Sequence, residues 1–154
     1  MLVDRLLLVP ATPVDNRLSS SWYFQSKFLK LKYMEEQLVY LEVAKLLKER
    51  EFSVNTNAYY DDCNKLQVDK PKNDWNDPLY LGTICSAPTQ SLAQQWIREK
   101  GIHIGIYANA SGWGWILTKC GGNGSCIKEI EDDTFFDTYE EALEEGLKQA
   151  LKLI

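Results

Sequence analysis

Residue types that often carry chemistry are sparse in this chain, which has one histidine and four cysteines among 154 residues. His103 stands between Ile102 and Ile104, a pattern typical of the solvent-facing position of a half-buried strand. As a general base it would need an acid or a nucleophile beside it, and the sequence indicates none. A cysteine-dependent enzyme is therefore only a second alternative, because His103 alone could activate a thiol.

The cysteines lack the spacing of a metal site. Structural zinc is usually bound by pairs of ligands about two to four residues apart. Cys120 and Cys126 have five residues between them, and Cys63 and Cys85 stand alone. We therefore expect no zinc, and interpret the cysteines as reduced thiols of a cytosolic protein.

Two further polar stretches are better explained as turns. Residues 121–125 read GGNGS, but they lack the Lys-Ser/Thr ending of a phosphate loop and lie between expected strands rather than before a helix. Asp61, Asp62 and Asn64 offer oxygen ligands for calcium, yet the EF-hand pattern is missing. The sequence thus predicts no catalytic residue, no cofactor and no metal ligand.

Trp113 and Trp115 alternate with Gly114 and so share one face of an expected strand. Either they belong to the core, where tryptophan is usually largely buried, or they form an exposed aromatic platform with Tyr107. Such a platform would be a binding surface, because large apolar patches seldom remain without a partner.

An acidic run lies close to the C-terminus. It contains nine acids and no base: Glu129, Glu131, Asp132, Asp133, Asp137, Glu140, Glu141, Glu144 and Glu145. Most charge runs are solvated loops or helix faces. The alternative is an acidic decoy that engages a nucleic-acid-binding host protein, and Glu140, Glu141 and Glu144 would then extend the candidate binding surface.

The element with the strongest signal is a C-terminal helix over 138–154. Small or apolar residues recur there at the spacing of one helix face: Tyr139, Ala142, Leu143, Gly146, Leu147, Ala150, Leu151 and Ile154. Thr138 and Glu141 predict a capping box at its start. Glu144 falls on the opposite, polar face, where we expect alanine to be tolerated.

The preceding residues predict the surface on which this helix lies. A second helix is expected over 89–100 and ends at Gly101; its apolar face comprises Leu92, Ala93, Trp96 and Ile97. Three antiparallel strands follow, expected over 102–107, 113–118 and 127–136. The expected order of elements in the C-terminal half is helix, three strands, helix. This order predicts a two-layer α+β fold with an antiparallel sheet packed by helices.

The middle of the chain has weaker patterns. A helix is expected over 34–50, a strand over 52–60 and a returning strand at 66–68. Residues 69–78 have the composition of an exposed loop, and residues 79–81 of a short strand. These elements complete the expected domain.

Residues 1–33 differ from the rest. Pro10 and Pro13 interrupt this segment, and its apolar residues do not keep the regular spacing of a helix or a strand. We expect an appended, poorly ordered tail before a single α+β domain over 34–154, the alternative being a genuine N-terminal helix over 22–33.

Composition also limits the function. The net charge is −5 and no basic patch is found, which argues against a nucleic-acid surface. No apolar stretch reaches the length of a membrane span, and no signal peptide is recognised, so we expect a cytoplasmic protein without membrane contact.

Three blocks within 34–154 carry a resemblance: LEVAKLLKEREF, APTQSLAQQWIREKGIHIGIY and DTYEEALEEGLKQALKLI. Together they resemble a family of short hypothetical proteins of Bacteroides-type gut bacteria and their phages or mobile elements. Members begin near the position of Met34, which agrees with the tail interpretation. The resemblance implies no activity, cofactor or catalytic residue.

The order of elements is also similar to that of double-stranded-RNA-binding domains. Those domains need lysines at the start of the last helix, where this chain has acids, so the departure argues against RNA binding. We expect instead a small cytosolic interaction or accessory protein, acting by binding, most simply to another protein, rather than by catalysis.

Deletion of residues 1–33 tests the domain boundary. Because the composition changes at Met34, we expect the shortened chain to melt cooperatively at nearly the temperature of the full chain, as measured by circular dichroism. Loss of the cooperative transition would show that residues 1–33 belong to the core.

Overall fold

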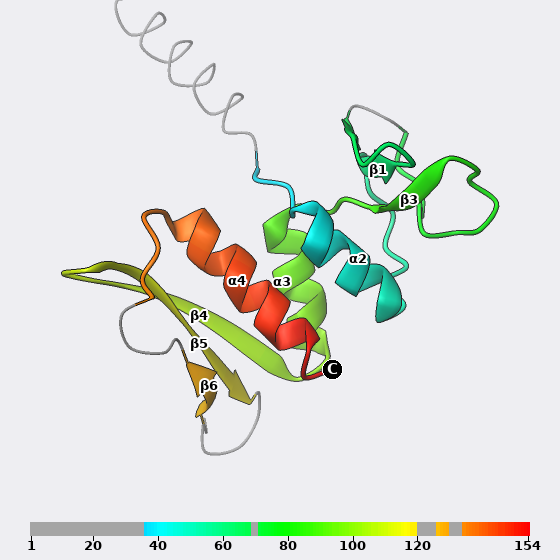
Figure 1. Cartoon of the computed structure of the whole chain (residues 1–154). Helices are drawn as coiled ribbons and strands as arrows, with labels where there is room; N and C mark the ends of the chain where they lie inside the picture. Colours follow the sequence, from blue (N-terminus) through cyan, green and yellow to red (C-terminus); the bar gives the residue numbers. More distant parts are fainter. Residues whose placement is uncertain (1–35, 69–70, 120–125, 130–133) are drawn as a thin grey trace, which may run out of the picture. The chain divides into compact units, whose positions relative to one another are not determined.

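The computed structural model describes residues 36–68, 71–119, 126–129 and 134–154, and these form an α+β fold (Figure 1). The elements of this part of the chain are α2 (Leu41–Glu49), β1 (Tyr59–Asp61), β2 (Leu66–Gln67), β3 (Thr83–Ser86), α3 (Gln90–Glu99), β4 (Ile102–Asn109), β5 (Gly112–Lys119), β6 (Cys126–Glu129) and α4 (Tyr139–Leu151). The strands make two antiparallel sheets, ordered β2-β1-β3 and β4-β5-β6. The predicted fold class is confirmed.

Helix α4 lies on the sheet β4-β5-β6, as its apolar periodicity predicted (Figure 1). Thr138 and Glu141 form the capping box, in which each residue's amide donates to the other's side chain at 3.2 Å. The buried side of α4 comprises Ala142, Leu143, Glu144, Gly146, Leu147, Ala150 and Leu151. Tyr139 and Ile154, also expected there, are 40% and 39% exposed, because they lie at or beyond the helix ends.

Gly146 permits a close approach between α4 and the sheet. A Cβ atom built on Gly146 would lie 2.9 Å from Ile104 Cγ2 and 3.4 Å from Trp115 Cβ. Contacts under 3 Å are strongly repulsive in a close-packed interior. Any larger residue would therefore force the helix or the Ile104 side chain to move.

Helix α3 begins and ends where the sequence indicates. Thr89 is its N-cap, and Thr89 Oγ1 accepts a hydrogen bond from the Leu92 amide at 3.3 Å. Gly101 follows the helix with φ of +92°, a conformation that glycine adopts readily. The apolar side chains that α3 buries are Ala93, Trp96 and Ile97.

Helix α2 is shorter than predicted. It begins at Leu41, and the described residues before it are extended. The Val39 amide donates to Pro88 O at 3.0 Å, and Leu38 forms an isolated bridge with Thr89. These bonds with the segment before α3 replace the helical bonds that the apolar periodicity suggested.

The small sheet also differs from expectation. The strand predicted over 52–60 is reduced to β1, and Thr56 forms only an isolated bridge with Asn73. The returning strand at Leu66 is confirmed as β2. The short strand predicted at 79–81 is wrong, because these residues form turns and β3 begins after them.

Leu147 is fully buried in the middle of α4. Leu147→Ala removes buried methyl groups and leaves a cavity, so we expect the free energy of unfolding to fall by roughly 2–5 kcal/mol. Lys45→Ala, on the exposed side of α2, is the control and should change it by about 0.5 kcal/mol or less. Urea denaturation of the three proteins measures both values, and equal effects would contradict the packing of α4.

Candidate functional site

The register of β4 and β5 separates the three aromatic residues expected to form a platform. Tyr107 pairs with Gly114, which lies between Trp113 and Trp115. Because paired residues share a face of the sheet and neighbours along a strand alternate, Tyr107 lies on the face opposite the tryptophans. A single platform of all three residues is therefore wrong.

The tryptophans lie on the helix-covered face. Trp115 is 4% exposed and belongs to the core, while Trp113 is half-buried, with its ring edge-to-face on Tyr139 at 5.5 Å. Tyr107 is 37% exposed and lies over Gly114, where a Cβ atom would meet its Cζ at 2.6 Å. Only Tyr107 of the three belongs to the outer face of the sheet.

The acidic residues of α4 have unequal environments. Glu140 and Glu141 are exposed, although Glu141 is engaged in the capping box. Glu144 is 6% exposed, so its predicted position on the polar surface is wrong. Residues 130–133 of the acidic run lie outside the described residues. Of the acidic residues predicted on the polar face of α4, Glu144 thus does not contribute to the surface.

Glu144 links α4 to the beginnings of both other helices. Its Oε1 accepts a hydrogen bond from the amide of Tyr40, the N-cap of α2, at 2.7 Å. Its Oε2 accepts one from Nε2 of Gln90, the first residue of α3, also at 2.7 Å. Burial raises the pKa of the Glu144 carboxyl above its usual value, although both hydrogen bonds act to lower it. These donors lie far from Glu144 in sequence, which explains why periodicity misplaced it.

Two of the described cysteines, Cys63 and Cys85, have environments that do not activate a thiol. His103 is exposed on β4, as predicted. Burial raises the pKa of the Cys85 thiol to about 11, and a hydrogen bond with the neighbouring aspartate raises the pKa of Cys63. Both thiols are therefore protonated near neutral pH, which disfavours a thiolate nucleophile. Cys120 and residues 121–125 lie outside the described residues.

One group with metal-ligand character occurs in the described part of the chain. Ligand atoms of Asp61, Asp62 and Cys63 lie within 4.8 Å of one another. However, Asp61 Oδ1 accepts hydrogen bonds from the amides of Cys63 and Lys65, and Asp61 Oδ2 accepts one from Gln67 Nε2. The Asp61 carboxylate thus closes the turn between β1 and β2, as the turn interpretation predicted.

Among the large apolar side chains of the described residues, the most exposed belong to the loop before β3. Figure 1 shows where this loop lies. Leu79 is 84% exposed and Leu81 is 95% exposed. Residues 77–82 are hereafter termed the apolar tip. Sequence reasoning missed it, because the three consecutive apolar residues were interpreted as a strand.

Local chemistry fixes the conformation of the apolar tip. Asp77 accepts hydrogen bonds from the Tyr80 amide at its backbone oxygen (3.1 Å) and from the Leu79 amide at its side chain (2.9 Å). Pro78 suits the second position of this turn, and Gly82, with φ of +80°, supplies the left-handed conformation of the next. The bracketing of three apolar residues by proline and glycine is the signal that could have identified a turn.

The apolar tip is attached to the core through aromatic contacts. The Tyr80 ring contacts that of Trp75 at 4.9 Å, and Trp75 in turn contacts Tyr59 at 4.5 Å. Trp75 is 8% exposed, and its Nε1 donates to Thr56 O at 2.9 Å. The prediction that residues 69–78 form an exposed loop is therefore wrong at Trp75, whose indole finds a buried acceptor.

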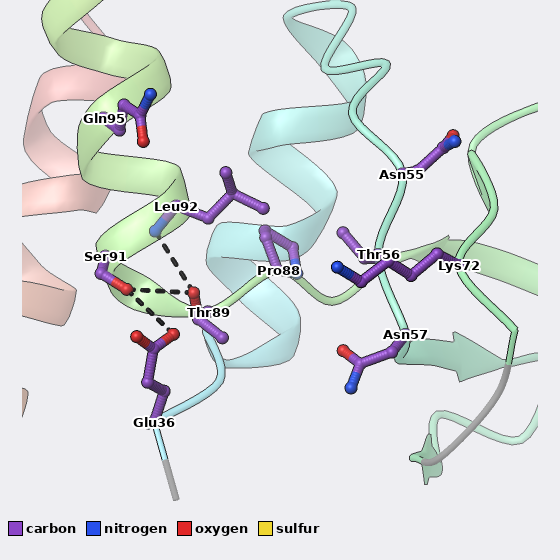
Figure 2. A pocket seen from close by; sticks show the side chains of 10 residues that line it. All are labelled: Glu36, Asn55, Thr56, Asn57, Lys72, Pro88, Thr89, Ser91, Leu92 and Gln95. Atoms are coloured by element: carbon purple, nitrogen blue, oxygen red, sulfur yellow. Dashed lines mark hydrogen bonds between the residues drawn. The ribbon is translucent and has the colours of Figure 1, made fainter.

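A pocket of about 410 Å³ lies between the start of α3 and the segment around Thr56 (Figure 2). Its lining residues are Glu36, Asn55, Thr56, Asn57, Lys72, Pro88, Thr89, Ser91, Leu92 and Gln95. Figure 2 shows the Lys72 side chain reaching past Thr56 toward Pro88. No local sequence pattern indicates this pocket, since separate segments contribute its walls.

Comparisons with known proteins do not identify a relative, since no protein-family model, curated protein or solved structure matches. Among the helices of the described residues, none combines the length and the apolar composition needed to cross a bilayer.

The buried carboxyl of Glu144 predicts a pH dependence of stability. Because its pKa is raised in the folded state, the folded chain binds this proton more tightly than the unfolded chain does. The resulting stabilisation is fully present below the ordinary pKa of 4.5 and is lost as the pH rises through the raised folded value. Relative to Glu144→Gln, the wild-type chain should therefore gain stability as the pH falls from about 7 to 4.

Denaturant melts across this pH range provide the measurement. Glu140→Gln, at an exposed position of the same helix, is the control; because it retains Glu144, it should show the same pH dependence as the wild-type chain. A difference between wild type and Glu144→Gln that stays constant with pH would contradict the raised pKa.

Proposed function

We propose that this chain is a small cytosolic accessory protein that binds a protein partner through the apolar tip and does not act by catalysis. The exposure of Leu79 and Leu81 on a fixed pair of turns carries the proposal. Single exposed leucines are ordinary on protein surfaces. Two leucines that are almost fully exposed and held by ordered turns are instead typical of a contact surface.

Burial of these leucines would supply substantial binding free energy. Enclosing one leucine side chain is worth about 1.5–3 kcal/mol. Since Asp77, Pro78 and Gly82 already order the backbone of the tip, little conformational entropy would be lost on binding. The tip therefore suits an apolar groove that encloses both leucines.

Acidic neighbours favour a protein over an anionic membrane surface. The Asp62 amide donates to Gly82 O at 3.1 Å, which places Asp62 beside the tip, and Asp77 lies at its start. Anionic lipid headgroups would repel these carboxylates. A partner groove with lysine or arginine at its rim would complement them.

Capture experiments with the double variant Leu79→Ser, Leu81→Ser test this proposal. The immobilised wild-type chain and the variant are compared in a lysate of the native host, with bound proteins quantified by mass spectrometry. Because the change removes about 3–6 kcal/mol of burial, capture should fall by roughly a hundredfold or more. The melting temperature should be unchanged, since both side chains are exposed.

Leu153→Ser is the control, because Leu153 is also exposed (47%) but lies outside the tip. It should capture the same proteins as the wild-type chain. If the double variant also retains them at the wild-type level, the apolar tip is not the binding surface.

A further inference from the structure

The pocket beside α3 carries separated charges. Lys72 extends over it from one wall and forms no ion pair with any described residue (Figure 2). Glu36 contributes a carboxylate from a different segment, and its Oε2 accepts a hydrogen bond from Ser91 Oγ at 3.1 Å. The pocket thus offers a cation and an anion whose charges are not neutralised by each other.

The surface between these charges is neutral. Pro88 and Leu92 provide apolar contact area. Asn57 and Gln95 provide carboxamides, each with donors and an acceptor that no described residue uses. None of the 10 lining residues is aromatic, so the pocket offers no ring on which a nucleobase would stack.

We propose that this pocket binds a small aliphatic zwitterion, namely an amino acid or a dipeptide. Lys72 receives the carboxylate and Glu36 the ammonium group, while the aliphatic side chain contacts Pro88 and Leu92. The volume of about 410 Å³ lies within the range of small-molecule sites, roughly 300–1,000 Å³. This inference does not depend on the apolar tip.

Nuclear magnetic resonance of the ¹⁵N-labelled full chain tests the site directly. The side-chain amide signals of Asn57 and Gln95 should shift saturably with L-leucine or glycyl-L-leucine, with dissociation constants near 1 mM, about −4 kcal/mol. The comparison of these two probes decides between amino acid and dipeptide. N-acetyl-L-leucine lacks the ammonium group and L-leucinamide lacks the carboxylate, so each should bind about tenfold or more weakly.

Charge variants assign the two ends of the ligand. Lys72→Gln should weaken leucine binding about tenfold without changing that of leucinamide, and Glu36→Gln should weaken leucine binding without changing that of N-acetyl-leucine. Lys65→Gln, at the exposed turn between β1 and β2, is the control and should bind as the wild type does. Unperturbed backbone signals elsewhere establish that each variant is folded.

Two results would overturn the proposal. One is the absence of a saturable shift at Asn57 and Gln95 with leucine and glycyl-leucine up to about 50 mM, far above the expected dissociation constant. The other is leucine binding that both charge variants leave unchanged. Either result would remove the assigned chemistry while leaving the function of the apolar tip to its own test.

Discussion

The packing of α4 holds the described part of this chain together, because this helix contacts α2, α3, β4 and β5. Gly146 allows α4 to approach the sheet closely, since a Cβ atom there would lie 2.9 Å from Ile104 Cγ2. Two residues before Gly146, Glu144 accepts hydrogen bonds from Tyr40 at the start of α2 and from Gln90 at the start of α3. Apolar packing therefore fixes α4 on the sheet and on the other two helices, and one buried carboxyl adds hydrogen bonds to the starts of both helices. The Glu144 carboxyl requires both hydrogen-bond donors, because a buried acid without partners would lower the free energy of unfolding.

The candidate binding surface depends on this frame through a few long-range hydrogen bonds. Asn76 donates to Phe52 O at 2.6 Å and accepts from the Ser86 amide at 2.9 Å, which joins the base of the apolar tip to the segment after α2 and to β3. The Tyr60 hydroxyl donates to Val39 O at 3.0 Å and so joins β1 to the segment before α2. Because the base of the tip is fixed in this way, Leu79 and Leu81 are held out from an ordered structure. The hydrogen bonds at the base of the tip thus keep these two leucines exposed at the surface where the partner contact is proposed.

Features governed by local chemistry were predictable from the sequence. The capping box at Thr138, the N-cap at Thr89 and the apolar periodicity of α3 and α4 involve residues close together in the chain. Features governed by distant partners were not: Glu144 looked exposed because its donors come from other helices, and Trp75 looked like a loop residue because its acceptor lies in another segment. The separation of Tyr107 from the tryptophans follows from the hairpin register and could have been derived from the turn after Asn109. The pocket beside α3 required the tertiary structure, since its walls come from separate segments.

We expect the apolar tip to be ordered before any partner binds. Backbone ¹⁵N relaxation of the free chain measures this directly at the amides of Leu79, Tyr80 and Leu81. We predict order parameters of about 0.85, equal to those of the adjacent strand β3, because the turns and the Trp75 contact restrict the backbone. Order parameters below about 0.6 at these amides would mean that the leucines belong to a flexible loop, and would contradict the account.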